Sequence, residues 1–194
     1  MKESLYRLDS DLLIWINSFG IESMDSFWLY VTSIWTWIPL FVFIVYLFLR
    51  HLNRQDAFLA TMFFGATGVA VLAVKTMTKM LFQRLRPCNV EELAASLRVL
   101  LCEDSYSFFS GHASFSFAIT SFAVLSLRKE MKGASMLYIW PILFALSRMI
   151  AGVHYPSDII VGAGVGLIVG AAMHAIYQKK IIKLPAFLIN KFNL

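Results

Sequence analysis

The stretch SRMIAGVHYPSD (residues 147–158) brings three ionisable side chains into an otherwise apolar part of the chain. Arg148 offers a planar guanidinium suited to phosphate oxygens, and His154 precedes Asp158 by four residues. Because a glycine and a proline interrupt the helical pattern here, we expect His154 on a turn and Asp158 in the first turn of the next helix. A carboxylate at that place can hold one ring nitrogen of His154 and leave the other as a nucleophile or base.

Two other stretches carry groups that complement this one. KMLFQRLRP (79–87) contains Lys79 and Arg86, and the segment FSGH contributes three residues: Ser110, Gly111 and His112. A helix that begins at Ser110–Gly111 would direct free N–H groups at an anion. Three cations and such N–H groups can stabilise a phosphoryl group in transfer, while one histidine attacks phosphorus and the other protonates the leaving oxygen. The pattern therefore predicts phosphoryl chemistry.

A histidine-based zinc or iron site is the competing chemistry, and the sequence argues against it. Only two histidines belong to the cluster, no H-E-x-x-H motif occurs, and three cations beside a metal ion would be unfavourable. We therefore expect no metal and no cofactor. Outside the cluster, we expect packing or surface roles for His51 and His174, and we expect Lys75 and Arg84 to extend toward the membrane interface.

The composition indicates the kind of protein that must position these groups. The chain has 194 residues, of which 59% are hydrophobic and 15% charged, and its mean hydropathy is +0.69. Soluble domains carry about 25% charged residues, so a soluble protein with a large core is the less favoured alternative. The net charge of +5 does not indicate nucleic acid, because the basic residues lie in short clusters beside apolar segments. We expect a membrane protein with no nucleic-acid partner.

Five apolar segments are predicted to cross the bilayer: residues 27–49, 57–74, 106–127, 133–147 and 159–177. The second segment can continue as a helix through Lys75 and Lys79. No internal repeat or linker divides the chain, so we predict an all-α, polytopic membrane helical bundle that forms a single domain over residues 1–194. On the fifth segment, three glycines would let a neighbouring helix approach closely: Gly162, Gly166 and Gly170. We expect that neighbour within the same chain, with a homodimer as the alternative.

The segment before these spans has helical periodicity but too many charges to cross the membrane. Its apolar residues recur at helical spacing: Leu5, Leu8, Leu12, Trp15, Ile16 and Phe19. We expect an interfacial amphipathic helix over residues 5–19, with a distorted sixth span as the alternative. Charges throughout residues 1–24 leave no apolar core for a cleavable signal peptide.

The basic residues give an orientation for five spans. They cluster in the link after the first span, the link after the third and the tail after the fifth, at Arg50, Arg54, Arg128, Lys129, Lys132, Lys179, Lys180 and Lys183. We therefore place these segments and the C-terminus in the cytoplasm. Link 80–105 and turn 151–157 then lie on the outer side of the inner (plasma) membrane, facing the periplasm or exterior. The outer side also carries basic residues, although the positive-inside rule places most Lys and Arg in the cytoplasm. An anionic ligand would explain these outer basic residues.

The three stretches resemble the three-part signature of the type 2 phosphatidic acid phosphatase family, which includes the vanadium haloperoxidases. The family pattern begins with Lys, six residues and Arg-Pro, which residues 79–87 match. It ends with Ser-Arg, five residues, His, three residues and Asp, which residues 147–158 match in full. The middle part, Pro-Ser-Gly-His, departs at Phe109, which stands where the family has proline. The signature covers residues 79–158.

The resemblance implies a role for each matched position. His154 would attack phosphorus and form a phosphohistidine, Asp158 would orient it, and His112 would protonate the departing alcohol or phosphate. The phosphate would be bound by the remaining matched residues: Lys79, Arg86, Ser110, Gly111 and Arg148. The implied activity is metal-independent hydrolysis of a membrane lipid phosphate.

The two cysteines, Cys88 and Cys102, lie in the predicted outer link. On that side they face an oxidising compartment and can form a disulfide, whereas two free buried cysteines are the alternative. Such a bond would stiffen residues 91–101, which we expect to form a short amphipathic helix over the site.

Within the family, the bacterial candidate substrates include undecaprenyl diphosphate, phosphatidylglycerol phosphate, phosphatidic acid and lipid A phosphates. Since the chain has little mass outside the membrane to hold a large sugar headgroup, we place undecaprenyl diphosphate first. Three other classes compete: a vanadium haloperoxidase, a non-enzymatic lipid or anion transporter, and a structural membrane protein. Five spans argue against the first. His154 and Asp158 with His112 argue against the second, and the signature as a whole argues against the third.

Overall fold

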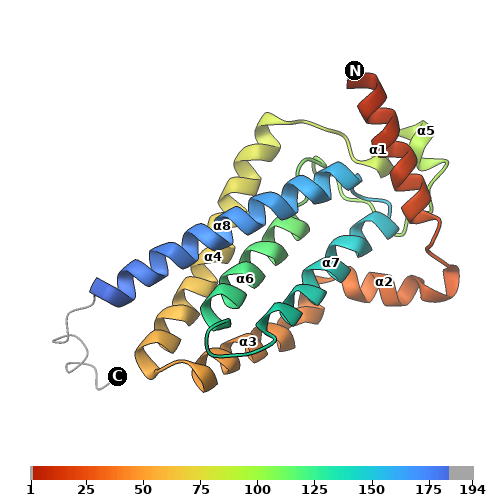
Figure 1. Cartoon of the computed structure of the whole chain (residues 1–194). Helices are drawn as coiled ribbons and strands as arrows, with labels where there is room; N and C mark the ends of the chain where they lie inside the picture. The colour runs from red at the N-terminus through yellow and green to blue at the C-terminus, as the bar shows by residue number, and fades with distance from the viewer. Residues whose placement is uncertain (1, 184–194) are drawn as a thin grey trace.

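Helices account for all regular secondary structure in residues 2–183, the part of the chain that this computed structural model describes (Figure 1). Three helical stretches are long and apolar enough to cross a membrane: Ile34–His51, Arg54–Leu81 and Pro156–Lys180. Two shorter apolar stretches accompany them, at Gly111–Leu127 and Ala134–Ile150. The predicted all-α membrane fold is confirmed, and each of these stretches overlaps one predicted span.

The main helices of the bundle are α3 (Ile38–His51), α4 (Arg54–Leu81), α6 (Gly111–Leu127), α7 (Ile139–Ile150) and α8 (Pro156–Lys183). Helix α6 contacts each of the other four and is buried along most of its length (Figure 1). Helix α4 runs unbroken through Lys75 and Lys79, as the sequence predicted. It thereby carries Lys79 to the end of the bundle at which α6 and α8 begin.

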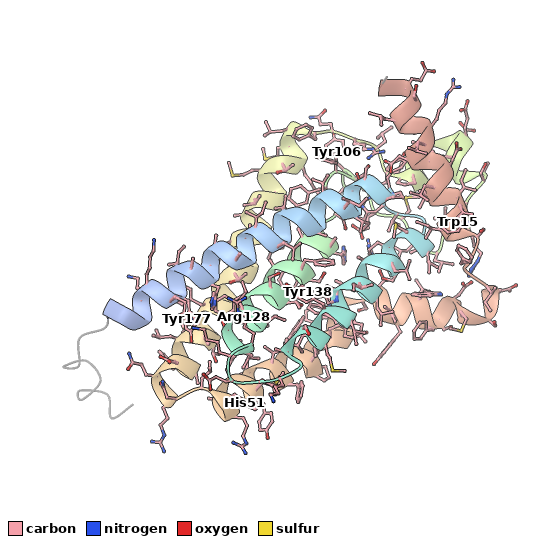
Figure 2. The ribbon with its side chains drawn as sticks, in the orientation of Figure 1. Trp15, His51, Tyr106, Arg128, Tyr138 and Tyr177 are labelled. Carbon is pink, nitrogen blue, oxygen red and sulfur yellow. A yellow bond between two sulfur atoms is a disulfide. The ribbon has the colours of Figure 1, made fainter. Side chains whose placement is uncertain are left out.

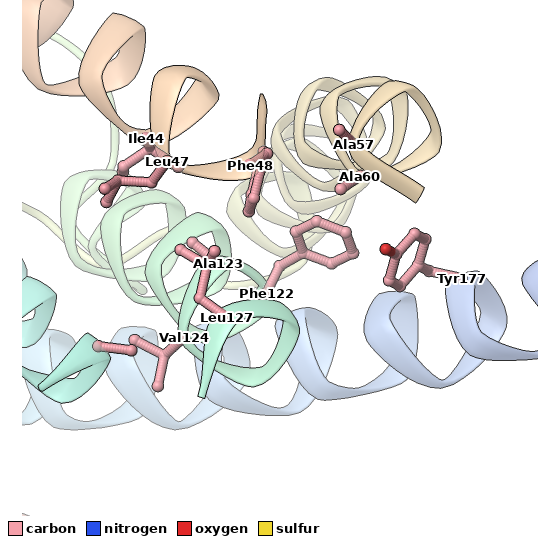
Figure 3. Packing of buried hydrophobic residues seen from close by; sticks show 11 residues of the cluster. Ile44, Leu47, Phe48, Ala57, Ala60, Phe122, Ala123, Val124, Leu127 and Tyr177 are labelled. Atoms are coloured by element: carbon pink, nitrogen blue, oxygen red, sulfur yellow. The ribbon is translucent and has the colours of Figure 1, made fainter. Parts of the chain in front are cut away.

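An apolar cluster joins α3, α4, α6 and α8 toward the other end of the bundle (Figure 3). Phe122 of α6 packs between Phe48 of α3 and Tyr177 of α8, with ring-centroid distances of 6.3 Å and 5.6 Å. His51 and Arg128 lie at this same end (Figure 2). The helices that carry the signature residues are therefore fixed to one another by a core at the end remote from the signature.

The glycine ridge on the last span packs against α6 of the same chain. A Cβ added at Gly162 would lie 2.7 Å from the carbonyl oxygen of Ser110, and one at Gly166 would lie 2.5 Å from that of Ser114. Glycine permits this approach because it has no side chain, so the two helix backbones lie in direct contact. The predicted intrachain partner is confirmed, and a ridge already filled by α6 gives no support to a homodimer.

The first predicted span is wrong as a single helix. Residues 27–49 are divided between α2 (Asp25–Thr32) and α3, with extended backbone at Ser33. The side chains of Thr36 and Trp37 donate hydrogen bonds to carbonyl groups near the end of α2, at 2.7 Å and 2.8 Å. These bonds satisfy carbonyls that have lost their helical partners, and they stabilise the break.

Two further predicted helices are shorter than expected. Helix α6 begins at Gly111, five residues later than predicted, because the loop before it bends into the candidate site. The helix predicted over residues 91–101 is reduced to α5 (Glu91–Ala94). The N–H of Arg98 instead donates to the side-chain oxygen of Asn17 at 2.8 Å, so a tertiary contact replaces the local helical bond.

A disulfide joins Cys88 and Cys102, whose Cα atoms are 6.0 Å apart. It closes the loop that contains α5. Arg86 lies two residues before Cys88, and Glu103 directly follows Cys102. The bond therefore holds the backbone of these two charged residues in the same part of the molecule.

Helix α1 (Lys2–Asn17) lies across the end of the bundle at which α8 begins and contacts α7 and α8 (Figure 1). One face is buried, where Leu13 packs with Tyr155 and Asn17 donates to the carbonyl of Ile150 at 2.7 Å. Four of the predicted apolar residues are exposed, and the first three of them line a groove between α1 and the start of α8: Leu5, Leu8, Leu12 and Trp15. A helix with one protein-facing side and one apolar outer side suits the membrane interface.

Candidate active site

One cavity of about 380 Å³ gathers charged residues where α4 ends and α6 begins. Its ionisable lining is Lys75, Lys79, Arg86, Glu103, His112 and His154. Its apolar side is formed by Ile34, Leu72, Phe115 and Phe144. A larger groove of about 690 Å³ lies between α1 and the start of α8, but within residues 2–183 neither histidine of the signature lines it. The smaller cavity is therefore the candidate active site.

His154 lies in the turn between α7 and α8 and is 1% exposed. Its Nε2 atom is 3.1 Å from Nη1 of Arg86, and its Nδ1 atom is 3.3 Å from Oδ2 of Asp158. A guanidinium group can only donate, so Nε2 must accept and the ring proton lies on Nδ1, facing the carboxylate. This tautomer places the lone pair of His154 on Nε2, where it accepts from Arg86.

Asp158 is fully buried in the first turn of α8, and both of its oxygens have partners. Besides the ring of His154, Oδ2 accepts from the N–H of Tyr155 at 3.1 Å and from the hydroxyl of Ser107. Oδ1 accepts from Nη1 of Arg84 at 2.9 Å. These bonds fix the carboxylate that orients the histidine ring.

Arg84 does not extend toward the membrane interface, as the sequence had predicted. Its guanidinium stacks over the ring of Tyr155, 3.6 Å from the centroid, and it joins Asp158 to Asp9 of α1. The Asp9 carboxylate accepts from Nη2 of Arg84 at 2.6 Å and from the N–H of Ser157 at 2.9 Å. The prediction failed because both carboxylates lie 74 or 75 residues away in the sequence.

Two helices and one loop supply the predicted cations at the cavity or beside it. Arg86 and Arg148 are 1% and 2% exposed, and the carboxylate of Glu103 pairs with both of them. Lys79 extends from α4, with Nζ 3.2 Å from the hydroxyl of Ser105. The three cations predicted to bind phosphate are therefore close together, although the carboxylate of Glu103 already pairs with two of them.

Burial and neighbouring charge alter the ionisation of the groups that lie outside the spanning helices. Burial lowers the pKa of His154 well below its usual range, and the positive charges of Arg148 and Arg86 lower it further. Burial would raise the pKa of Glu103, but the charges of Arg148 and Arg86 outweigh this effect and lower the pKa. At neutral pH, His154 is therefore uncharged and Glu103 is ionised.

The start of α6 brings backbone N–H groups to the cavity. Ser110 is the N-cap of this helix, with Oγ accepting from the N–H of Ala113 at 3.3 Å, and its own N–H donates to the carbonyl of Asp158. A Cβ at Gly111 would lie 2.5 Å from Cδ of Lys75, so a larger residue here would displace that lysine. Lys75 thus lines the cavity instead of extending to the membrane interface, which corrects the second of the two interface predictions.

His112 was predicted to belong to the site, and His174 was predicted to have a packing or surface role. His112, in the first turn of α6, forms part of the cavity lining, with its ring packed edge-on against Phe144 at 5.2 Å between centroids. His174 lies on α8 away from the site, where Nδ1 is 3.2 Å from the hydroxyl of Ser126. That contact agrees with the packing role expected for His174.

The structure adds residues that the sequence analysis missed. Glu103, Ser107 and Asp9 contact the signature residues directly or through Arg84, yet none belongs to a local pattern. Lys75 had a usable signal, because it precedes Lys79 by four residues and so shares its helical face.

A helical membrane fold with two histidines, one of them oriented by a carboxylate, and several cations at one cavity defines a membrane phosphatase. The sequence profile of the PAP2 superfamily matches residues 57–182, which extend from α4 to α8. The chain belongs to this superfamily, and the family expected from the signature is confirmed.

Relatives and a solved structure agree with this assignment. A lipid A 4'-phosphatase of Bacteroides thetaiotaomicron is 29% identical over 194 residues, which cover 96% of this chain and 84% of that protein. A lipid A 4'-phosphatase of Porphyromonas gingivalis is 26% identical, over 90% of this chain and 75% of that protein. The crystal structure of a transmembrane PAP2 type phosphatidylglycerolphosphate phosphatase from Bacillus subtilis has a TM-score of 0.69 at 21% identity, and the match covers 91% of this chain and 87% of that one. This last likeness shows a shared fold.

Proposed function

We propose that this membrane phosphatase hydrolyses a lipid phosphate through a phosphohistidine formed on His154. One observation carries the proposal: the uncharged ring of His154 is held between Asp158 and Arg86, with the lone pair on Nε2 in a cationic cavity. Cations and helix N–H groups at that place can bind the three equatorial oxygens of a phosphoryl group. Because Lys79, Arg86 and Arg148 supply the positive charge, the reaction needs no metal ion.

In the first step, Nε2 of His154 attacks phosphorus and the bond from phosphorus to the lipid oxygen breaks. His112 gives its proton to that oxygen, and the dephosphorylated lipid leaves. The ring of His154 gains positive charge as the phosphorus–nitrogen bond forms. Asp158 stabilises this charge through the hydrogen bond from Nδ1.

In the second step, water replaces the histidine on phosphorus. His112, which has lost its proton, accepts one from the water molecule, whose oxygen attacks phosphorus. The phosphorus–nitrogen bond breaks, His154 returns to its uncharged form, and inorganic phosphate leaves. His112 is then protonated again, so the enzyme returns to its starting state.

For the substrate we propose lipid A that carries a phosphate monoester. Both relatives that bear this name match 90% or more of the chain. Helix α1 and the loop that contains α5 also cover the catalytic end of the bundle (Figure 1). The chain therefore has more mass at this end to hold a sugar headgroup than the sequence had suggested. Undecaprenyl diphosphate is the second candidate, because Lys75 adds a cation to the cavity and favours a more highly charged ligand.

We further propose that the catalytic end faces the periplasm or exterior of the inner membrane. The disulfide between Cys88 and Cys102 lies at this end, and such bonds persist in oxidising compartments. The basic links after α3 and α6 lie at the other end, where the positive-inside rule places the cytoplasm. The end of α8 would then also be cytoplasmic.

The test is phosphate release by detergent-purified protein in EDTA from lipid A, undecaprenyl diphosphate, phosphatidylglycerol phosphate and phosphatidic acid. We expect release by the wild type, fastest from lipid A, and none by His154→Ala. The matched control is His51→Ala, at the opposite end of the bundle, which should behave as the wild type. Equal release by wild type and His154→Ala would overturn the histidine mechanism. Absence of release from every lipid would favour a binding or transport function.

A further inference from the structure

Glu103 lies where the cationic side chains of the cavity should hold phosphate. Its Oε2 atom accepts from Nη2 of Arg86 at 2.7 Å, and its Oε1 atom accepts from Nη2 of Arg148. Two oxygens of one carboxylate thus bind both guanidinium groups, as two oxygens of a phosphate would. Arg86 at the same time donates from Nη1 toward Nε2 of His154, the atom that must be free to attack phosphorus.

The pairing has an electrostatic cause. Arg86 and Arg148 are almost completely buried, and a buried cation without an anion is strongly unfavourable. Asp158 cannot balance them alone, because its carboxylate is bound by Arg84 and Ser107. Within residues 2–183, Glu103 is the carboxylate that forms ion pairs with these two arginines.

Substrate phosphate and the Glu103 carboxylate compete for the same donors. Both are anions, so sharing the two guanidinium groups would bring like charges into contact. The side chain of Glu103 is 38% exposed and can turn toward solvent. The backbone of Glu103 directly follows Cys102, and the disulfide from Cys102 to Cys88 keeps this backbone close to Arg86. Rotation of the side chain is therefore enough for Glu103 to leave and to return.

We propose that Glu103 is an internal counter-anion of the phosphate site. It occupies the site in the free enzyme, substrate phosphate displaces it, and it returns to Arg86 and Arg148 as inorganic phosphate leaves. This inference rests on the proposed phosphatase function. Glu103 thereby determines how tightly the enzyme binds any phosphate, and it favours release of the product over retention.

The experiment compares Glu103→Gln with Asp104→Asn, which removes the same charge from the neighbouring residue. The affinities for inorganic phosphate and orthovanadate are measured by calorimetry on the detergent-purified proteins, and phosphate release from the lipid panel is measured in parallel. We expect Glu103→Gln to bind both anions about tenfold more tightly, because binding no longer displaces a carboxylate. Asp104→Asn should bind them as the wild type does.

Weaker or unchanged anion binding by Glu103→Gln would overturn the proposal and would make Glu103 a residue that only holds the two arginines in place. Glu103→Asp provides a second test if the glutamine variant does not fold. Its shorter side chain keeps the charge but loses reach, so its affinity should lie between wild type and Glu103→Gln. If no protein releases phosphate from lipid while Glu103→Gln still binds anions more tightly, the proposed function fails and the counter-anion role stands. If lipid hydrolysis is normal but Glu103→Gln does not bind anions more tightly, the proposed function stands and the counter-anion role fails.

Discussion

At the scale of single residues, the proposed mechanism places two demands on His154 that usually conflict. A phosphate site must be strongly cationic, and a histidine nucleophile must be unprotonated to attack phosphorus. Burial lowers the pKa of His154, and the positive charges of Arg148 and Arg86 lower it further. In the proposed mechanism the same two guanidinium groups bind the phosphate, so they serve both demands. Asp158 accepts a hydrogen bond from the ring proton on Nδ1, so the tautomer is fixed before the substrate arrives.

The protonation of His154 can be measured directly. The chain has four histidines, so a His154→Ala variant assigns one ring ¹³C signal by its loss. Because burial and the neighbouring arginines lower the pKa, a proton should bind only at a pH below the usual histidine value of about 6.5. We therefore expect the signal to keep its uncharged position through the pH range in which an ordinary histidine titrates, which is centred on about pH 6.5. A titration midpoint at or above about pH 6.5 would contradict this account.

At the scale of elements, α1 is more than an amphipathic segment at the membrane. Its Asp9 binds Arg84, which binds Asp158, so a chain of three charged groups connects the helix to the carboxylate that orients His154. The exposed apolar face of the same helix is suited to lipid. The position of α1 should therefore influence the geometry of the active site.

Asp9→Asn tests this connection, with Asp11→Asn on the same helix as the matched control. Asp11 is exposed, whereas Asp9 is largely buried and accepts from Arg84 and Ser157. Loss of the charge-assisted bonds should lower the free energy of unfolding by about 1–3 kcal/mol and should reduce kcat/KM. Thermal unfolding in detergent and phosphate release measure the two effects. Identical behaviour of the two variants would show that α1 is not connected to the site through Asp9.

The contact between α6 and α8 is the second element-scale feature that positions the site. Helix α6 supplies the N–H groups beside His112, and α8 supplies Asp158, so their separation sets the distance between these groups. Gly162 lies against the carbonyl of Ser110, directly at the start of α6. Close backbone approach along the ridge is thus part of the site's construction.

Gly166→Ala should destabilise the protein, and Gly164→Ala on the same helix is its control. A Cβ at Gly166 would lie 2.5 Å from the carbonyl oxygen of Ser114, so the helices must move apart at a cost of about 1–3 kcal/mol. A Cβ at Gly164 meets nothing within 4 Å, and alanine there should be neutral or slightly stabilising. The comparison is made by thermal unfolding in detergent. Equal midpoints for the two variants would refute the packing argument.

At the scale of the whole molecule, the bundle has a regular apolar end and an irregular catalytic end. The apolar runs and the signature spacings were enough to predict the all-α membrane fold and the family, since both signals are local in the sequence. They also predicted part of the cavity lining: Lys79, Arg86, Gly111, His112 and His154. The division of the first span at Ser33 was not visible, because apolar residues continue on both sides of it. The hydrogen bonds of Thr36 and Trp37 that stabilise the break depend on the folded chain.

The site residues that the sequence analysis missed were also not visible because their contacts form only in the folded chain. Glu103 pairs with Arg148, which is 45 residues away, and Asp9 pairs with Arg84, which is 75 residues away. Neither pairing leaves a periodic or spaced pattern in one sequence. Arg84 was misjudged for this reason, since an arginine near the end of a span resembles an interface residue until its carboxylate partners are known.

The most direct measurement for the central claim is the search for a phosphate group on His154. Lipid A with a ³²P-labelled phosphate is mixed with the purified protein, and the reaction is stopped in alkali, in which phosphohistidine survives. We expect the wild type to carry label at early times, on the peptide that contains His154, and His154→Ala to carry none. Turnover by the wild type without label at any quench time, or label that persists in His154→Ala, would contradict the account.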